Sequence, residues 1–432
     1  QGKTTVFKAQ LRILPSVAFI SAFLNNTPVV VIFAPIIKHW AKSVKLPATK
    51  FLIPLSYVTI LGGICTLIGT STNLVVHGMI LEAGYEGFTM FELGKVGIFI
   101  AIAGIIYLFI FSKRLLPDAR PDTAVPDEEV EEGEKLHRVE AVLGARFPGI
   151  NKKLSDFNFQ RHYGAEVKEI KTRNGQRYVD HLEDVVLREG DTLVVMADDT
   201  FIPTWGESSV FVLLTNGNDP DTSGKKKRWL ALILLVLMIV GATVGELPAT
   251  KEMFPDIKLD MFFFVCITTI IMAWTNIFPA RKYTKYISWD ILITIACAFA
   301  ISKAMVNSGV ADCVAGFIIG LSDDYGPHVL LAILFVITNL FTELITNNAA
   351  AALAFPLALS ISAQLGVSPT PFFVVICMAA SASFSTPIGY QTNLIVQGIG
   401  NYKFTDFVRI GLPLNIITFL ISVILIPLIW NF

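Results

Sequence analysis

Charged residues are scarce in this chain of 432 residues. They make up 16% of it, while hydrophobic residues make up 53%, whereas roughly a quarter of the residues of a soluble domain are charged. The 34 Lys and Arg are balanced by 35 Asp and Glu, so there is no basic excess to bind a nucleic-acid backbone. The composition predicts a polytopic membrane protein with no nucleic-acid partner.

Several common chemical motifs are also missing. The five cysteines include no CxxC pair, so the sequence indicates neither a disulfide framework nor a zinc site. It contains no G-x-G-x-x-G and no G-x-x-x-x-G-K-[ST] motif, the patterns typical of dinucleotide and phosphate binding. No nucleophile, base and orienting group can be assembled in its polar part. The sequence therefore predicts a protein that is not an enzyme and holds no cofactor.

Long apolar runs are plentiful, and they are of two kinds. About 20 apolar residues are needed to cross the hydrocarbon layer. Five runs are uninterrupted: Leu93–Phe111, Trp229–Gly245, Met261–Pro279, Ile287–Met305 and Ile410–Trp430. Four others are interrupted midway by polar, Gly or Pro residues: Leu11–Ile37, Phe51–Ile80, Val329–Leu365 and Phe372–Gly398. The interrupted runs predict broken helices or re-entrant hairpins inside an α-helical membrane protein.

The chain divides at a polar middle region. We expect a first membrane repeat over 1–111, an acidic linker over 112–134, a small cytosolic α+β domain with a basic linker over 135–228, and a second membrane repeat over 229–432. Strand-like sequence occupies 139–143, 165–170 and 191–197, a short helix is expected near 153–162, and turns are expected at 174–175 and 189–191.

Basic residues indicate the orientation. Clusters at Lys38–Lys50, Lys113–Arg114, Lys225–Arg228 and Arg281–Lys285 face the cytosol under the positive-inside rule. Residues 112–228 are then cytosolic. The hairpin over 11–37 enters and leaves on the cytosolic side, whereas the hairpin over 329–365 has no flanking Lys or Arg and enters and leaves outside. The two hairpins are therefore expected to be inverted relative to each other.

The inverted hairpins have related sequences. SAFLNNTPVVVIFAP (21–35) matches TELITNNAAAALAFP (342–356) without a gap, so that Asn347 follows Asn26 by 321 positions. The next elements match as well, with IGTSTNLVVHG (68–78) beside IGYQTNLIVQG (388–398). Packing alone explains one polar pair in a membrane helix, but it explains poorly two pairs that lie at matched positions. The doubled pattern predicts an internal repeat that carries the function.

Inverted repeats with broken helices are typical of secondary transporters. A break exposes helix N-termini that attract anions and carbonyl oxygens that coordinate cations. The Asn-Asn pair in each hairpin marks its tip. Neither tip contains Lys, Arg or His, and the only nearby carboxylate is Glu343. Coordination of sodium by oxygen atoms is therefore favoured over a proton relay. A cation antiporter would place Asp or Glu in the broken helices, and a channel would need a carbonyl-lined filter. Both remain alternatives.

The repeat also bears on the length of the chain. Only 25 residues precede Asn26, whereas about 118 residues with three apolar runs separate the polar region from Asn347. If the two repeats are built alike, a further three spans of roughly 90 residues in total are expected upstream of this sequence.

The paired tips LNNTP and ITNNA, each followed by an IG-x-x-TN span, resemble the divalent-anion:sodium symporter family of sulfate and di- or tricarboxylate carriers. The resemblance implies that sodium drives uptake of a small divalent anion, and that homodimers move a transport domain against a scaffold in an elevator-like motion. It implies substrate contacts at Asn26, Thr27, Asn347 and Asn348. It also implies one sodium site near Ser21, Asn25, Asn26 and Gly69, and another near Thr342, Asn347 and Gly389.

The chain departs from the dicarboxylate carriers of that family. Asn25 replaces Ser, Asn348 replaces Thr, and the second-span loops lack the usual Pro pair. The polar insertion is similar to a TrkA-type C-terminal (RCK-C) regulatory domain, and such insertions resemble the sulfate branch of the family. We therefore expect sulfate or a similar oxyanion as substrate, with a di- or tricarboxylate as the alternative. The insertion is expected either to bind a small cytosolic ligand or mediate dimerisation, or to serve as a passive spacer. A place in the bacterial inner membrane is a further expectation.

Overall fold

A computed structural model describes most of the chain. It covers residues 5–118, 137–144, 146–172, 176–198, 201–205, 210–215, 225–245, 248–253, 259, 261–275, 277, 289–320 and 326–432. Most of the expected acidic linker, the expected turn at 174–175 and the basic cluster at 281–285 lie outside the described residues.

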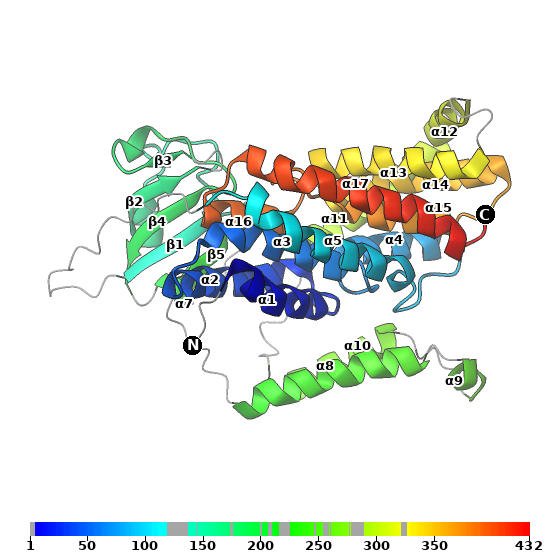
Figure 1. Ribbon diagram of the computed structural model, residues 1–432, viewed down its shortest axis with the longest axis horizontal. Helices are drawn as coiled ribbons and strands as arrows, with labels where there is room; N and C mark the ends of the chain where they lie inside the picture. The colour runs from blue at the N-terminus through cyan, green and yellow to red at the C-terminus, as the bar shows by residue number, and fades with distance from the viewer. Residues whose placement is uncertain are drawn as a thin grey trace.

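Helices build the main body of the protein (Figure 1). Before the polar region they are α1 (Val6–Ser21), α2 (Asn26–Ser43), α3 (Leu52–Gly63), α4 (Ser71–Glu82) and α5 (Gly94–Leu115), with a short 3-10 turn at Ala48–Lys50. After it come α8 (Lys225–Gly245), α9 (Pro248–Met253), α10 (Met261–Trp274), α11 (Trp289–Asn307), α12 (Val310–Gly320), α13 (Gly326–Leu344), α14 (Asn347–Leu365), α15 (Thr370–Ser381), α16 (Gln391–Gly400) and α17 (Phe404–Ile429).

Each of the four interrupted apolar runs folds as two helices with a break between them. The breaks separate α1 from α2, α3 from α4, α13 from α14, and α15 from α16. They fall at the polar and Gly residues of the runs, where side chains compete for backbone hydrogen bonds or backbone freedom is high. The prediction of broken helices is confirmed at all four places.

Four described helices are long and apolar enough to cross a membrane: α5, α13, α14 and α17. The consecutive helices α11 and α12 together form a fifth candidate, bent by 71° at the break between them. The expected span over 261–279 is shorter in the structure, because α10 ends at Trp274 after 14 residues. At a rise of 1.5 Å per residue this helix covers only about 21 Å.

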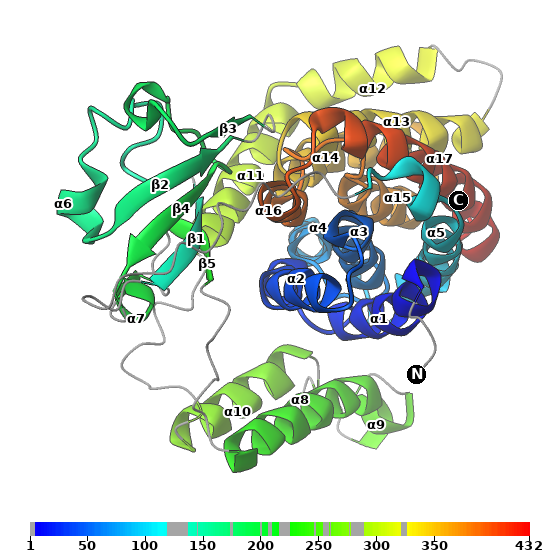
Figure 2. The ribbon, with the colours of Figure 1, turned by 60° about the vertical axis from the view of Figure 1, so that its left-hand side comes forward.

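Two of the interrupted runs, α1–α2 and α13–α14, are the hairpins, and the other two, α3–α4 and α15–α16, are called the broken spans. The first helix of each broken span, α3 or α15, forms the centre of the helical body. Every residue of α3 is buried, and so is α15 from Pro371 to its end at Ser381. Helix α3 packs against α1 and α2, and α15 packs in the same way against α13 and α14. Figure 2 shows α3, α4 and α15 inside a ring of the other helices, with α8, α9 and α10 set apart from this body. The broken spans are therefore enclosed, with the hairpins around them.

The polar region folds as a five-stranded antiparallel sheet in the order β3-β2-β4-β1-β5. Its strands are β1 (His137–Leu143), β2 (Glu166–Lys171), β3 (Arg177–Tyr178), β4 (Thr192–Ala197) and β5 (Phe211–Thr215), with short helices α6 (Phe159–Tyr163) and α7 (Phe201–Trp205). The three expected strands coincide with β1, β2 and β4. The expected helix near 153–162 is displaced to α6. An aromatic cluster of Phe147, Phe157, Phe159, Tyr163 and Phe211 fills the core of this sheet unit.

The sheet unit contacts the helical body at one end (Figure 1). Lys38 on α2 pairs with Glu140 on β1 at 3.2 Å, and Lys171 on β2 lies 3.4 Å from the same carboxylate. Burial raises the pKa of Glu140, but the attraction of Lys38 and Lys171 outweighs it and lowers the pKa to about 2. Glu140 is therefore ionised at neutral pH and ties the sheet to the first hairpin.

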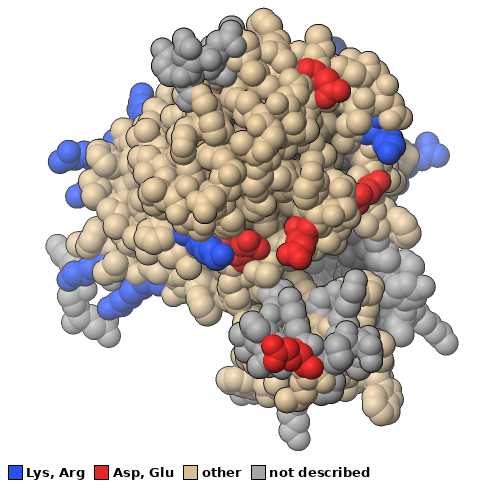
Figure 3. All heavy atoms as spheres, turned by 90° about the vertical axis from the view of Figure 1, so that its right-hand side faces the viewer, with Lys and Arg blue, Asp and Glu red and all other residues tan. Residues whose placement is uncertain are grey.

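The opposite end of the body has a different surface. Figure 3 shows this end as mostly uncharged, with a few separate acidic and basic side chains. At the other end, Lys38 of the first basic cluster contacts the sheet through Glu140, as expected if that end faces the cytosol.

Candidate functional site

The tip of each hairpin is closed by one hydrogen bond between side chains. Ser21, at the end of α1, donates to Oδ1 of Asn26, the first residue of α2, at 2.8 Å. Thr342 near the end of α13 donates to Oδ1 of Asn347, the first residue of α14, also at 2.8 Å. All four residues are buried. The sequence match between the tips thus extends to their geometry, and each amide oxygen is held in a fixed orientation.

Glycines in the broken spans allow backbone oxygens to approach these tips. A Cβ on Gly63 would lie 2.6 Å from Oδ1 of Asn26 and 3.1 Å from the carbonyl oxygen of Gly69. In the second half, a Cβ on Gly389 would collide with the carbonyl oxygen of Thr342. Larger residues are therefore excluded at these positions. The predicted sodium-site residues Ser21, Asn26 and Gly69 gather in one place, and Thr342, Asn347 and Gly389 gather in another.

The loops between the broken-span helices repeat the same hydrogen bonds. Thr66 accepts from the backbone N–H of Gly69, and Thr386 accepts from that of Gly389, at 3.1 and 3.3 Å. Each threonine hydroxyl also donates to a backbone carbonyl at the end of the preceding hairpin helix; the acceptors are Ala22 and Glu343. Asn73 and Asn393 donate to the carbonyls of Thr66 and Thr386. Each tip is thus anchored to its own broken span.

Each tip also contacts the broken span of the other half. Thr27 donates to Oε1 of Gln391 at 3.3 Å. Asn348 accepts at Oδ1 from the hydroxyls of Ser71 and Thr72, both at 3.3 Å. These predicted substrate-contacting residues therefore lie where the two halves meet.

The hydroxyl of Tyr390 is a further link between the halves. It accepts a hydrogen bond from Nδ2 of Asn26 at 2.5 Å and lies 3.1 Å from the hydroxyl of Thr70. Tyr390 is not among the site residues predicted from the sequence. The available signal was the one aromatic residue in the second IG-x-x-TN motif, at the position of Thr70 in the first.

Asn25 behaves differently from the other predicted sodium-site residues. Its side chain is exposed, and within the described part of the chain no hydrogen bond joins it to Ser21, Asn26 or Gly69. Its counterpart Thr346 instead caps the N-terminus of α14 by accepting from a backbone N–H.

Glu343 lies beside the second tip and anchors it. Its Oε1 accepts from the backbone N–H of Ser385 at 2.8 Å and from Nδ2 of Asn415 on α17 at 2.7 Å. Ala22 occupies the matching position in the first hairpin, so this carboxylate has no counterpart there. The arrangement connects the second hairpin to α17 through one side chain.

The electrostatics of the tips suit small ions. Helices α2 and α14 begin at Asn26 and Asn347, and their free N–H groups carry partial positive charge toward the tips. The fixed amide, hydroxyl and carbonyl oxygens beside them suit a hard cation. The arrangement has the donors to bind an anion between the halves and the oxygens to bind a cation at each tip.

Comparison with known proteins gives the family. The citrate transporter (CitMHS) family model matches residues 7–361 and 253–432. An uncharacterized transporter of Synechocystis is 30% identical over 496 residues, covering 95% of this chain and 81% of the relative. Sodium/sulfate cotransporter 2 of Chlamydomonas reinhardtii is 30% identical over 281 residues, covering 65% of this chain and 31% of the relative. The sodium-dependent dicarboxylate transporter SdcS of Staphylococcus saprophyticus is 25% identical over 145 residues, covering 34% and 28%. The predicted resemblance to divalent-anion:sodium symporters is thereby supported, and the chain belongs to the citrate transporter family, as an integral membrane transporter rather than an enzyme.

Proposed function

We propose that the protein is a sodium-coupled symporter of a small divalent oxyanion of the sulfate type. The observation that carries the proposal is that the tip of each hairpin hydrogen-bonds the broken span of the other half. Thr27 bonds to Gln391, and Asn348 bonds to Ser71 and Thr72. Asn26 and Asn347, the first residues of α2 and α14, both hydrogen-bond the hydroxyl of Tyr390, so the two helix N-termini converge there. An oxyanion held there is bound by hydroxyl, amide and backbone N–H groups rather than by a fixed basic side chain.

Sodium is the proposed coupling ion. The two oxygen clusters, around Asn26 and around Asn347, each combine an amide oxygen, a hydroxyl and a backbone carbonyl, which comes from Gly69 in the first and from Thr342 in the second. Sodium bound at both tips supplies the positive charge that the tips lack as side chains, so cation and anion bind together. The sodium/sulfate cotransporter of Chlamydomonas reinhardtii supports this pairing of ions.

Transport requires that the site opens alternately to the two sides. We propose that the two halves are inverted repeats and that the helices around the tips move together as an elevator against a scaffold in a homodimer. The sheet unit lies on the cytosolic side in this proposal and serves as a TrkA-type regulatory domain for a small ligand. The bacterial inner membrane is the proposed location.

A di- or tricarboxylate is the second candidate substrate. It is favoured by the citrate transporter family model and by the dicarboxylate transporter of Staphylococcus saprophyticus. Carboxylates and sulfate share the negative oxygen atoms that the tip donors bind, so the choice depends on the size of the space between the halves.

Uptake into proteoliposomes tests the proposal. Labelled sulfate should accumulate when sodium is present outside and not when potassium replaces it, with citrate and succinate as competitors. Asn26→Ala and Asn347→Ala should abolish uptake, whereas Asn307→Ala, which removes an exposed amide at the end of α11, should leave it intact. Sodium-driven uptake of citrate or succinate without sulfate would select the second candidate. Uptake that is independent of sodium would refute the coupling.

A further inference from the structure

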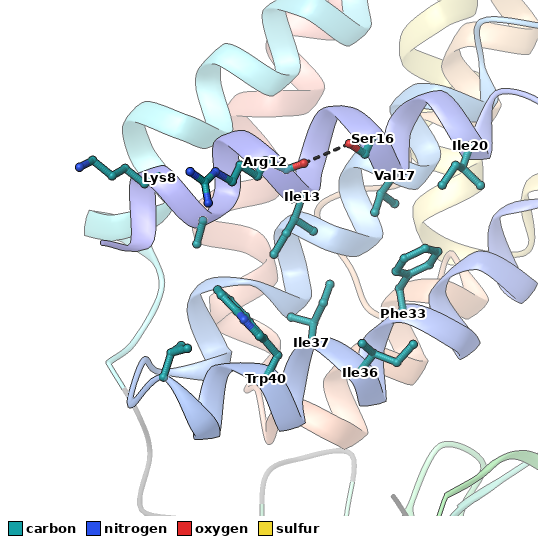
Figure 4. A pocket seen from close by; sticks show the side chains of 12 residues that line it. Lys8, Arg12, Ile13, Ser16, Val17, Ile20, Phe33, Ile36, Ile37 and Trp40 are labelled. Atoms are coloured by element: carbon teal, nitrogen blue, oxygen red, sulfur yellow. Dashed lines mark hydrogen bonds between the residues drawn. The ribbon is translucent and has the colours of Figure 1, made fainter. Parts of the chain in front are cut away.

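A groove of about 780 Å³ runs between α1 and α2, the two arms of the first hairpin (Figure 4). Its walls are apolar over most of their length, with Val17 and Ile20 on α1 and Phe33, Ile36 and Ile37 on α2. Ile36 is 57% exposed. A groove with such walls in a membrane protein is suited to hydrocarbon rather than to a hydrated ion.

One end of the groove carries two positive charges. Lys8 and Arg12 lie four residues apart on α1, on the same face of the helix, and both line the groove. Both are exposed, and no carboxylate among the described residues pairs with either. The charges are therefore available to an external anion.

The charged end of the groove lies at the ends of the hairpin arms that are remote from the tip. Figure 4 places Lys8, Arg12 and Trp40 toward one end of the groove and Ile20 and Phe33 toward the other. The charged end is the start of α1 and the end of α2, on the side of the body where the sheet lies (Figure 1). Tryptophan is enriched at the membrane–water interface. From Lys8 to Ile20 the helix rises about 18 Å, which is comparable to an extended acyl chain.

We propose that this groove binds one anionic phospholipid of the leaflet on the side of the sheet. Its phosphate pairs with Lys8 and Arg12, and one acyl chain lies along Val17, Ile20 and Ile36 between the hairpin arms. Basic pockets between membrane helices on this side are known to suit anionic headgroups. A free inorganic anion would satisfy the two charges and leave the apolar walls uncovered, so the combination selects a lipid.

The site is independent of the transported substrate, and it has a structural consequence. The lipid fills the space between the arms that carry Ser21 and Asn26 at their ends. It therefore supports the hairpin along the length of its two arms, and its loss is expected to loosen the pairing of α1 with α2.

Native mass spectrometry of the purified full chain tests the proposal, with palmitoyl-oleoyl phosphatidylglycerol as probe and the phosphatidylcholine of the same chains as comparison. Phosphatidylglycerol should bind in preference. The double variant Lys8→Gln/Arg12→Gln should weaken it about 30-fold, because each basic residue near an anionic lipid contributes about a factor of five. Ile36→Trp, which fills the apolar wall, should displace both lipids from the groove.

Lys113→Gln/Arg114→Gln is the matched control. It removes two exposed basic residues at the end of α5 and should leave phosphatidylglycerol binding unchanged. The proposal is overturned if the control weakens binding as much as the Lys8/Arg12 variant, or if neither that variant nor Ile36→Trp alters it. Competition by inorganic phosphate at equal concentration would also overturn it, because it would identify a simple anion site.

Discussion

Replacing Tyr390 with Phe removes one hydroxyl from the contact between the two halves and preserves the ring. In the wild-type protein this hydroxyl accepts from Nδ2 of Asn26 at 2.5 Å, and Asn26 is fully buried. Water cannot easily replace the lost acceptor, so the amide is left with an unsatisfied donor, at a cost of about 1–3 kcal/mol. The same amide presents Oδ1 to the proposed sodium site. A reoriented amide should therefore weaken sodium binding.

The expected effect is a rise of about tenfold in the sodium concentration that gives half-maximal uptake, since about 1.4 kcal/mol corresponds to a factor of ten. It is measured as sodium dependence of substrate uptake into proteoliposomes. Tyr402→Phe is the matched control, because Tyr402 is also buried and its hydroxyl donates to the carbonyl of Thr49 at 2.5 Å, away from the tips. Both variants should lower thermal stability, but only Tyr390→Phe should shift the sodium dependence. The reasoning is refuted if the two variants shift it equally or not at all.

Three further changes have expected outcomes. Gly63→Ala should abolish sodium-dependent uptake while the protein still inserts and folds, because the added Cβ would lie 2.6 Å from Oδ1 of Asn26; wild-type sodium affinity in this variant would contradict the proposed cation site. Glu140→Gln should lower the unfolding temperature at neutral pH, because the lowered pKa of Glu140, about 2 instead of 4.5, stabilises the folded state above pH 4.5. That stabilisation, at most roughly 3 kcal/mol before screening by solvent, is lost as the pH falls toward 2, so wild type and variant should converge in thermal unfolding near pH 2; an undiminished difference at that pH would contradict the ion pair with Lys38. Glu343→Ala removes the acceptor of two hydrogen bonds and should reduce thermal stability without changing the number of sodium ions per anion; a changed stoichiometry, measured from reversal potentials, would show that Glu343 takes part in coupling.

Much of the helical body was predictable because its signals are local. The four breaks follow from polar, Gly and Pro residues inside apolar runs, and all four are present. The pairing of Ser21 with Asn26 and of Thr342 with Asn347 spans five residues, so the match between the tips already implied that they would be built alike. The length of α10 was overestimated, because an apolar composition continues beyond the point where the helix ends.

The contacts between each tip and the other half could not be predicted in the same way. Thr27 and Gln391 are separated by 364 positions, as are Asn26 and Tyr390. Each half of the sequence specifies its own hairpin and broken span, but neither specifies which surface of the other half it meets. The sheet unit shows the same limit, because strand-like sequence indicated β1, β2 and β4 while the pairing of Lys38 with Glu140 depends on how the sheet unit packs against α2.

The sequence by itself determined that the chain is a membrane protein with two related halves, since apolar content and the matched motifs are properties of the order of residues. The orientation of Asn26 and Asn347 at the breaks was also implied by short-range spacing. Only the tertiary structure decided that Tyr390 joins the halves, that Asn25 lies outside the cluster, and that Lys8 and Arg12 share a groove with the apolar face of α2. These features arise from packing between segments far apart in the chain, where the geometry of the whole body fixes which side chains meet.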